Sequence, residues 1–387
     1  MRILHCCLAN FYIDNYSYQE NILPKMHKLQ GHEVAILAST ETYIDNAVLG
    51  YVQPQSYYTK DGIPITRVAY IKWLPHFLVK KLRIYKGITT VMKNFKPDII
   101  FIHGCQFISI NEIATYANKN KNVRIYVDGH ADFINSAKNW ISKNILHKII
   151  YKWCTKKIEP YTRKFYGTLP LRVDFFKNVY DTPPEKTELL LLGVDDTQID
   201  FSQKENIKRN IRKELDLKDD DFVIVTGGKF DKRKNIHILM KAVNDLKTQD
   251  IRLIVFGTPN SEMKDEIDAL AKSSNIRYVG WIPSEKTYDY FFAADLGFFP
   301  GTHSVLWEQA VGVGLPCVFK KWEGIQHVDL DGNCLFLSSS GIDEIKENIL
   351  RLYRDSHLLE GMKHVAQEKG IPKFSYYEIA KKAIEEK

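Results

Sequence analysis

Short apolar runs and longer amphipathic stretches alternate along the first half of the chain. The runs are apolar throughout, which is typical of strands buried on both faces of a parallel sheet, and the stretches between them repeat with a helical period. This alternation predicts strands at 3–8, 33–38, 98–103 and 123–128, and helices at 18–30, 77–95 and 109–119.

The same alternation begins again after the acidic run at 219–221. It predicts strands at 222–226, 252–256, 276–279, 296–299 and 316–319, with helices at 235–247, 261–272, 285–294, 305–313 and 376–386. Two such series in 387 residues predict two doubly wound, Rossmann-like α/β domains, at 1–190 and 191–373. Ligands bind beyond the carboxyl ends of parallel strands, so we expect the two domains to face each other across an active-site cleft.

A glycine pair and two lysines stand between one predicted strand and the helix that follows it. Gly227 and Gly228 would let a phosphate approach the backbone, and the helix start offers unpaired N–H groups. Lys229 and Lys234 would complete a clamp for a diphosphate. A surface turn with two solvated lysines explains the same residues without function. Neither half contains the GxGxxG fingerprint, which disfavours a dehydrogenase.

A second motif follows the strand predicted at 296–299. A small-residue loop leads into a helix start at Ser304 and Val305, with the carboxylate of Glu308 one turn inside. A carboxylate at this place can accept both hydroxyls of a ribose, while the first N–H groups of the helix face a phosphate. The alternative makes Glu308 a solvated helix residue, although the apolar residues beside it argue against full exposure.

In this order the motifs resemble those of the retaining GT-B glycosyltransferases of family GT4, the glycosyl transferases group 1. That family carries a GHxV stretch, a glycine-basic-x4-lysine clamp, an EAxxxGxPVV stretch and a GxNGxLF-like element. The corresponding residues here are 31–34, 228–234, 308–318 and 331–336. The resemblance covers most of the chain, and it implies that a last helix at 374–387 completes the first domain.

The resemblance implies a hexosyltransferase that takes a nucleoside diphosphate sugar as co-substrate and needs no other cofactor. The chain has no Asp-x-Asp motif at a plausible strand end, so lysines would replace a divalent ion and we assign no metal site. The expected catalytic residues are His130, Lys229 and Lys234. The expected donor-binding residues are Gly227, Gly228, Lys229, Lys234, His303, Ser304, Val305 and Glu308.

One position departs from the family pattern. The family places two glutamates eight positions apart in this loop, and the position eight before Glu308 is Pro300. The first carboxylate, which the resemblance would place against the donor sugar, is therefore absent or replaced. His303 or Thr302 could fill its place, so the donor sugar and full catalytic competence stay open.

A polar cluster follows a predicted strand in the first half. Asp128, His130 and Asp132 stand at its carboxyl end, which suits function better than core packing. The cluster resembles the histidine-containing loop of the family, which implies that His130 faces the donor sugar. Tyr18 and Gln19 open the first helix, where relatives carry an acceptor-side loop, so we group them with Asp128 and Asp132 on the acceptor side. A turn with capping aspartates is the alternative.

The net charge of +7 is unevenly distributed. Residues 1–185 hold 25 Lys and Arg against 14 Asp and Glu, a balance of +11, while residues 186–387 hold 29 against 33, a balance of −4. Eight basic residues stand among tryptophans and aliphatic residues at 138–164, and 72–83 is a second basic stretch. This pattern fits a helix on an anionic membrane surface, and equally a helix buried on one face and solvated on the other.

The six cysteines are scattered without metal-ligand spacing, and no apolar run approaches the length of a membrane span. We therefore expect a cytoplasmic protein, peripheral on the inner face of the membrane if the basic segment binds lipid. The sequence favours sugar transfer to a glycan or lipid-linked glycan acceptor in cell-surface polysaccharide synthesis. One alternative is a catalytically silent scaffold that binds a nucleotide sugar or a partner enzyme. A weaker one is a nucleic-acid binder, which lacks any recognition motif, so we expect no nucleic acid as a partner.

Overall fold

The computed structural model describes residues 1–44, 48–133, 136–137, 139–246, 248 and 250–385. The chain forms two compact α/β domains, Met1–Leu191 with Ile379–Lys387, and Leu192–Glu378. The sequence placed the boundary one residue earlier and the return of the chain to the first domain at 374. Some positions of the predicted segments lie outside the described residues: 138 in the basic segment, 247 in the helix at 235–247, and 386 and 387 in the last helix.

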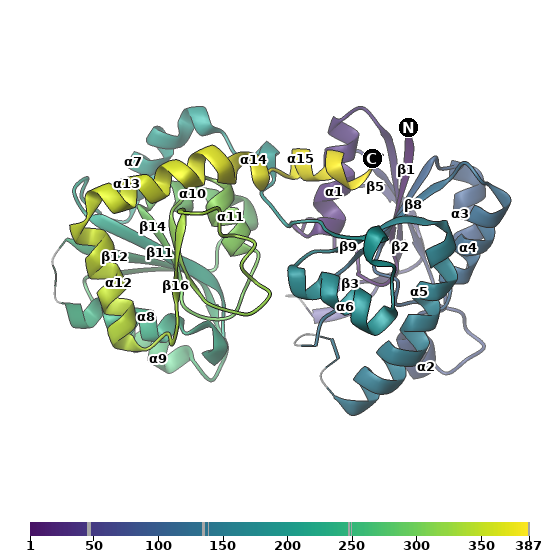
Figure 1. Ribbon diagram of the computed structural model, residues 1–387, viewed down its shortest axis with the longest axis horizontal. Helices are drawn as coiled ribbons and strands as arrows, with labels where there is room; N and C mark the ends of the chain where they lie inside the picture. Colours follow the sequence, from purple (N-terminus) through teal and green to yellow (C-terminus); the bar gives the residue numbers. More distant parts are fainter. Residues whose placement is uncertain (45–47, 134–135, 138, 247, 249, 386–387) are drawn as a thin grey trace. The chain divides into compact units, whose positions relative to one another are not determined.

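The first domain is built on a mainly parallel sheet (Figure 1). Its strands, with a separate β3–β4 hairpin, are β1 (Arg2–Cys7), β2 (Glu33–Ser39), β3 (Glu41–Ile44), β4 (Val48–Tyr51), β5 (Ser56–Tyr58), β6 (Pro64–Val68), β7 (Ile99–His103), β8 (Arg124–Gly129), β9 (Thr162–Gly167) and β10 (Thr187–Leu189). The order in the sheet is β10-β9-β8-β7-β1-β2-β6-β5, and only β5 runs antiparallel to its neighbour. The parallel strands therefore follow the doubly wound order, in which strands are added on one side of β1 up to β6 and on its other side from β7 onward.

Helices cover both faces of this sheet. They are α1 (Gln19–Leu29), α2 (His76–Leu82), α3 (Ile88–Phe95), α4 (Ile110–Lys119), the π-helical η1 (Ser142–Tyr151), α5 (Lys152–Ile158), α6 (Pro170–Tyr180) and α15 (Tyr376–Ala383), with short turns η2 (Glu159–Tyr161) and η3 (Pro184–Lys186). Side chains of α3, α4, α5 and α6 share one buried cluster with alternate residues of β1, β7 and β8. The other face of the strands packs under α1 and α15, where the Tyr126 hydroxyl donates to the Ile384 carbonyl (3.3 Å).

The second domain repeats the architecture with a fully parallel sheet. Its strands are β11 (Phe222–Phe230), β12 (Ile251–Pro259), β13 (Ile276–Gly280), β14 (Leu296–Phe299), β15 (Cys317–Lys320) and β16 (Cys334–Leu337). Their order is β13-β12-β11-β14-β15-β16. Successive strands are therefore added on one side of β11 up to β13 and on its other side from β14 onward. The helices are α7 (Lys204–Glu214), α8 (Ile236–Leu246), α9 (Lys264–Leu270), α10 (Thr287–Ala293), α11 (Leu306–Gly312), α12 (Ile342–Arg354), α13 (Ser356–Val365) and α14 (Ile371–Lys373), with short η4 (Asp196–Gln198), η5 (Phe201–Gln203), η6 (Lys232–Lys234), η7 (Ser284–Lys286) and η8 (Ala366–Gly370).

The prediction of two doubly wound α/β domains is confirmed, with local corrections. The helix predicted at 77–95 is two helices, α2 and α3, because Arg83 and Gly87 between them take positive φ angles. Strand β11 runs on through Gly227 and Gly228 to Phe230, where the sequence predicted a loop from 227. No helix formed by the described residues is long and apolar enough to cross a membrane.

Candidate functional site

Two loops of the second domain meet where the strand order reverses. Residues 231–235 follow β11 and residues 300–304 follow β14, and these strands are neighbours in the sheet. The Thr302 amide donates to the Arg233 carbonyl (3.0 Å). A Cβ atom at Gly301 would lie 2.3 Å from that carbonyl oxygen, so the backbones approach this closely because residue 301 is glycine. This is the place in a doubly wound sheet where ligands bind.

Lys234 ties the two loops together. Its ammonium donates hydrogen bonds to the carbonyls of Thr302 and His303, each at 2.8 Å. Burial lowers the pKa of Lys234 to about 8, although the Asp231 carboxylate partly offsets the effect. Lys234, Gly227 and Ser304 line one small pocket at the strand ends. The structure therefore brings together three of the predicted donor-binding residues.

Lys229 occupies a different position. It stands on the end of β11, exposed and paired in the ladder with Thr258, and its ammonium group makes no hydrogen bond or ion pair with another described residue. Gly228 before it has a φ of 119°, and a Cβ atom there would lie 3.3 Å from the Leu306 side chain at the start of α11. The α11 helix begins at Leu306 rather than Ser304, and Val305 is its N-cap.

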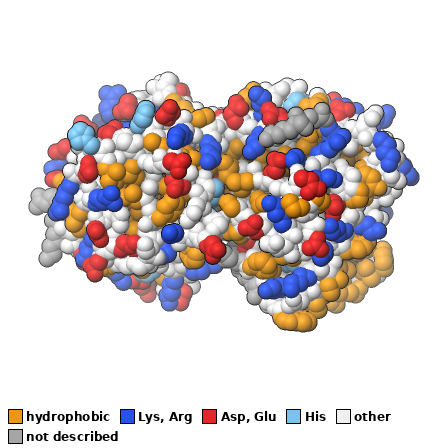
Figure 2. Space-filling model, in the orientation of Figure 1, with side chains coloured by type: hydrophobic (Ala, Val, Ile, Leu, Met, Phe, Trp, Pro, Cys, Tyr) orange, Lys and Arg blue, Asp and Glu red, His pale blue; other side chains and the backbone are white. Residues whose placement is uncertain are grey.

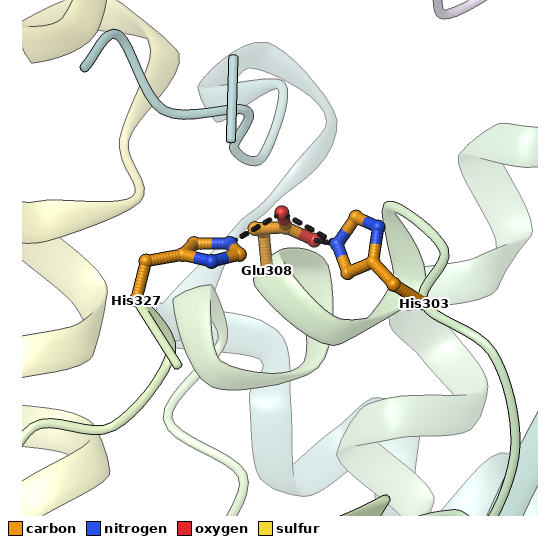
Figure 3. Close-up of side chains that lie close together, drawn as sticks. All are labelled: His303, Glu308 and His327. Carbon is orange, nitrogen blue, oxygen red and sulfur yellow. Dashed lines mark hydrogen bonds and ion pairs between the residues drawn. The ribbon is translucent and has the colours of Figure 1, made fainter. Parts of the chain in front are cut away.

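Glu308 lies inside the domain, between two histidines (Figure 3). Its Oε1 accepts hydrogen bonds from Nε2 of His303 (2.9 Å) and Nε2 of His327 (2.8 Å). The side chain has 0% exposure. Burial acts to raise the pKa of Glu308, but the two histidines outweigh it and the pKa is lowered. The interpretation of Glu308 as a solvated helix residue is therefore wrong.

The same three side chains offer ligand atoms for a metal ion. These atoms lie within 4.8 Å of one another, and two histidines with a carboxylate form a set that zinc accepts. The distances of 2.8 and 2.9 Å between Glu308 and the histidines are those of hydrogen bonds. Nδ1 of His327 has no hydrogen-bond partner among the described residues, whereas ligating histidines usually donate from that nitrogen. The geometry fits a hydrogen-bonded cluster better than a metal centre.

The family stretch also bears on Glu308. In the EAxxxGxPVV pattern the glutamate precedes the proline by seven positions, and counting back from Pro316 gives Gln309. The position eight before Gln309 is Gly301. By this count both family glutamates are replaced, and Glu308 is an additional carboxylate that binds His303 and His327.

The first-domain candidates gather at the ends of β8 and α1. Gln19 Nε2 donates to Oδ2 of Asp128 (3.1 Å), and Nε2 of His130 lies 4.0 Å from Oδ1 of Asp128 and 3.8 Å from Glu20. Burial lowers the pKa of His130, and the carboxylates of Glu20 and Asp128 oppose this shift. Three buried atoms, Asp128 Oδ1, Gln19 Oε1 and His130 Nε2, have no hydrogen-bond partner in the described part of the chain.

The two remaining acceptor-side candidates lie in other surroundings. Asp132 is buried and accepts a hydrogen bond from Nε of Arg172 (3.1 Å). Tyr18 is 42% exposed, and its ring stacks on Tyr16.

A chain of buried histidines runs from Asp128 to the C-terminal helix. Nδ1 of His103 lies 2.7 Å from Oδ2 of Asp128, and its Nε2 lies 3.0 Å from Nδ1 of His5. Nε2 of His5 lies 3.0 Å from Nδ1 of His27, whose Nε2 lies 2.9 Å from the carbonyl of Ala380 in α15. All four titratable side chains have 0% exposure.

Counting protons fixes the charge of this chain. The Ala380 carbonyl can only accept, so His27 donates from Nε2 and, if neutral, accepts at Nδ1. His5 and His103 must then also donate from Nε2 and accept at Nδ1. Nδ1 of His103 faces the Asp128 carboxylate, which is also an acceptor, so this contact needs one more proton. Burial lowers the pKa of His103, but the Asp128 carboxylate outweighs burial and the pKa is raised. The extra proton therefore lies on His103, which forms an ion pair with Asp128.

Sequence reasoning missed the residues that support these candidates. His103 ends a predicted strand beside β8. Because ligands bind at the carboxyl ends of parallel strands, its position could have marked it as a candidate. His5 and His27 sit inside an apolar strand and helix, and no local pattern marks them. His327 lies in a loop 19 positions after Glu308 and is joined to it only by folding.

Comparisons with known proteins bear on the fold and on the second domain. The sequence model of the family "Glycosyl transferases group 1" matches residues 207–369, less than half of the chain. An uncharacterised glycosyltransferase of Methanocaldococcus jannaschii is 20% identical over 216 residues, which are 54% of this chain and 55% of that protein. The lipopolysaccharide core biosynthesis glycosyltransferase LpsD of Rhizobium meliloti is 25% identical over 151 residues, 38% of this chain and 43% of LpsD. The matches thus span about half the length of these relatives.

A solved structure decides the fold. Anabaena HepE in complex with UDP-glucose superposes with a TM-score of 0.67 at 14% identity, covering 99% of this chain and 98% of HepE. The chain has the GT-B fold. The family match at 207–369 lies in the second domain of this fold.

Proposed function

We propose that this GT-B protein is a retaining glycosyltransferase, assigned to family GT4. It moves a hexose from a nucleoside diphosphate sugar to a glycan or lipid-linked glycan in cell-surface polysaccharide synthesis, and it works in the cytoplasm. The family match in the second domain and the relative in lipopolysaccharide core synthesis support this proposal. HepE, which shares the fold, binds UDP-glucose.

The observation that carries the proposal is that the loops at 231–235 and 300–304 meet between β11 and β14, where the strand order of the second domain reverses. Lys234 brings a positive charge there, and Gly227 and Ser304 lie beside it. A diphosphate at this place would gain charge-assisted hydrogen bonds from Lys234, with Lys229 free to turn toward it. We propose that the lysines neutralise the diphosphate without a metal ion, and that Glu308 acts on the ligand through His303.

In the proposed reaction the bond between the anomeric carbon and the diphosphate oxygen breaks. The acceptor hydroxyl oxygen forms the new bond on the same face of the sugar, and its proton passes to the departing diphosphate. No protein nucleophile takes part, so the residues act by positioning and by stabilising charge on the diphosphate.

The first domain would supply contacts to sugar hydroxyls. Asp128 Oδ1 and Gln19 Oε1 are buried acceptors without a donor in the described part of the chain, and hydroxyl groups of a sugar could satisfy both. The lowered pKa of His130 keeps its imidazole neutral near pH 7, which suits a hydrogen bond to the donor sugar.

Lys234→Met is expected to weaken the binding of UDP by about 1.5–3 kcal/mol, because a charge-assisted contact to the diphosphate is lost. Wild-type affinity should also fall as the pH rises past about 8, where the Lys234 ammonium deprotonates. Calorimetry with UDP, GDP and ADP in EDTA measures both effects.

Lys232→Met is the matched control. Lys232 lies in the same turn, exposed and paired with Glu262 (2.8 Å), so its loss should leave affinity unchanged. Binding that disappeared in EDTA, or equal losses in the two variants, would contradict the lysine clamp.

A nucleotide-sugar-binding scaffold without catalysis is the second candidate. The observation that favours it is the replacement of both family glutamates, by Gln309 and Gly301. Donor hydrolysis measured with a panel of UDP-, GDP- and ADP-sugars separates the two candidates. In an active enzyme, His303→Ala is expected to lower turnover by about tenfold or more with little change in nucleotide affinity, as for an interaction made mainly in the transition state. Tight nucleotide binding with no hydrolysis and no transfer would leave only the scaffold.

A further inference from the structure

One helical segment of the first domain carries large apolar side chains on its solvent-facing side. Helices η1 and α5 form a continuous segment at 142–158, whose inner side packs into the domain core through His147, Tyr151, Cys154, Thr155 and Ile158. Its outer side exposes Trp140 (70%), Ile141 (57%), Ile145 (38%), Ile149 (62%) and Trp153 (43%). Four of these recur at every fourth position, so they form one stripe along the helix.

This exposure separates the two interpretations of the basic segment. A helix buried on one face and solvated on the other should carry polar residues on its outer stripe. Here the outer stripe consists of isoleucine and tryptophan, and exposed apolar patches of this kind mark interaction surfaces. A merely solvated helix therefore does not account for 142–158.

Helix α2 extends the patch. The Tyr151 hydroxyl donates to the Lys81 carbonyl (2.8 Å), which ties the segment to α2. Trp73 and Phe77, just before and within α2, are 76% and 66% exposed. In Figure 2 hydrophobic side chains gather over this part of the first domain, at the lower right, with basic side chains among them. We call these residues, from 73–78 and 140–153, the α2–η1 surface.

Lysines accompany the apolar residues. Lys143 and Lys157 lie over the rings of Phe133 (5.0 Å) and Trp153 (5.3 Å), with their ammonium groups beside the stripe. Lys148 is also exposed, and none of the three forms an ion pair with another described residue. Lysine stems along an apolar surface, with charged heads at its rim and tryptophans beside them, match the interface of a bilayer with anionic headgroups.

We propose that the α2–η1 surface docks the first domain on an anionic phospholipid bilayer. Trp140, Ile141 and Ile149 enter the interface, and the lysines contact the headgroups. The charge balance of +11 over residues 1–185 favours this partner. Because apolar side chains insert, attachment weakens with salt but is not abolished by it, whereas the charges alone would predict complete release.

Vesicle flotation tests the proposal without reference to catalysis. The full chain is mixed with phosphatidylcholine vesicles, with or without about 30% phosphatidylglycerol, at about 0.1 M and about 0.5 M salt. Wild type should float with the anionic vesicles and remain partly bound at high salt. The triple variant Lys143→Gln, Lys148→Gln, Lys157→Gln should lose about 100-fold in affinity at low salt and little at high salt.

Two tryptophans of equal exposure provide a matched pair. Trp140→Ser is expected to lower binding by about tenfold, whereas Trp281→Ser, at a residue 73% exposed in the second domain, should leave it unchanged. Both side chains are on the surface, so circular dichroism should show folded variants. Equal flotation with neutral and anionic vesicles, or equal effects of the two serines, overturns the proposal. So does a dimer in solution that dissociates with Trp140→Ser, since the surface would then bind a second copy.

Discussion

Replacing Glu308 with alanine is expected to lower the free energy of unfolding of the second domain by about 3–5 kcal/mol. The carboxylate has 0% exposure and holds His303 and His327 by short hydrogen bonds. Its removal leaves two imidazole N–H groups without an acceptor and opens a cavity in the interior of the domain. Urea unfolding at neutral pH, followed by tryptophan fluorescence, measures the change.

Glu308→Gln separates charge from volume. The amide keeps the shape but offers one acceptor oxygen, so we expect a loss of about 1.5–3 kcal/mol.

The pH dependence follows from the lowered pKa of Glu308. A carboxylate of this kind stabilises the fold above its unfolded pKa of 4.5, and the contribution is lost as the pH falls toward its folded pKa. The difference between wild type and Glu308→Gln should therefore shrink below about pH 4.5. Glu347→Gln, at an exposed residue of α12, is the control and should be neutral. A Glu308→Gln variant as stable as wild type at pH 7 would contradict the buried cluster.

The sequence predicts the central strands well because burial on both faces leaves them apolar throughout. Residues 34–38 of β2, 99–102 of β7 and 222–225 of β11 show this pattern without interruption, and residues 3–7 of β1 show it except at His5. Strand β6 does not, because Thr66 and Arg67 interrupt it. That guanidinium is 2% exposed and bonds to the Ser39 carbonyl (2.8 Å) and to Asp14 (2.8 Å), but these partners are known only after folding. A buried arginine looks like a surface residue in sequence.

The candidate sites show the same limit. Gly227 in β11 and Lys234 in η6, which follows that strand, are close in sequence, so their nearness follows from local spacing. The position of Ser304 beside them follows from the order of β11 and β14 in the sheet. The sequence left open whether Lys229 is solvated or part of the clamp, and its exposure depends on β11 and β12 continuing together through the paired glycines at 228 and 257. The histidine chain depends on tertiary structure, since the order of β1, β7 and β8 brings His5, His103 and Asp128 together and helix packing adds His27.

Mild acid is expected to destabilise the first domain through His5 and His27. Burial lowers the pKa of His27 to about 3, and burial with the neighbouring histidines lowers that of His5 well below its usual value. Below pH 6.5 the unfolded chain binds protons at both histidines and the folded chain does not. The free energy of unfolding therefore decreases as the pH is lowered. Each histidine contributes about 1.4 kcal/mol per pH unit. His103 adds little in this range, because its raised pKa keeps it protonated in the folded chain, and below pH 6.5 it is also protonated in the unfolded chain.

A variant isolates one of these protons. In His27→Gln the amide can donate to the Ala380 carbonyl and accept from His5, but it cannot titrate. The variant should lose some stability at pH 7 through poorer packing, and the deficit should shrink by about 2 kcal/mol between pH 6.5 and about pH 5. Other buried histidines, such as His147 with a pKa lowered to about 4 by burial, affect wild type and variant alike. Urea unfolding at several pH values gives the two slopes, and His364→Gln, at an exposed histidine of the second domain, serves as the control. Parallel slopes for wild type and His27→Gln would show that His27 titrates equally in both states, and the neutral histidine chain beneath α15 would then be wrong.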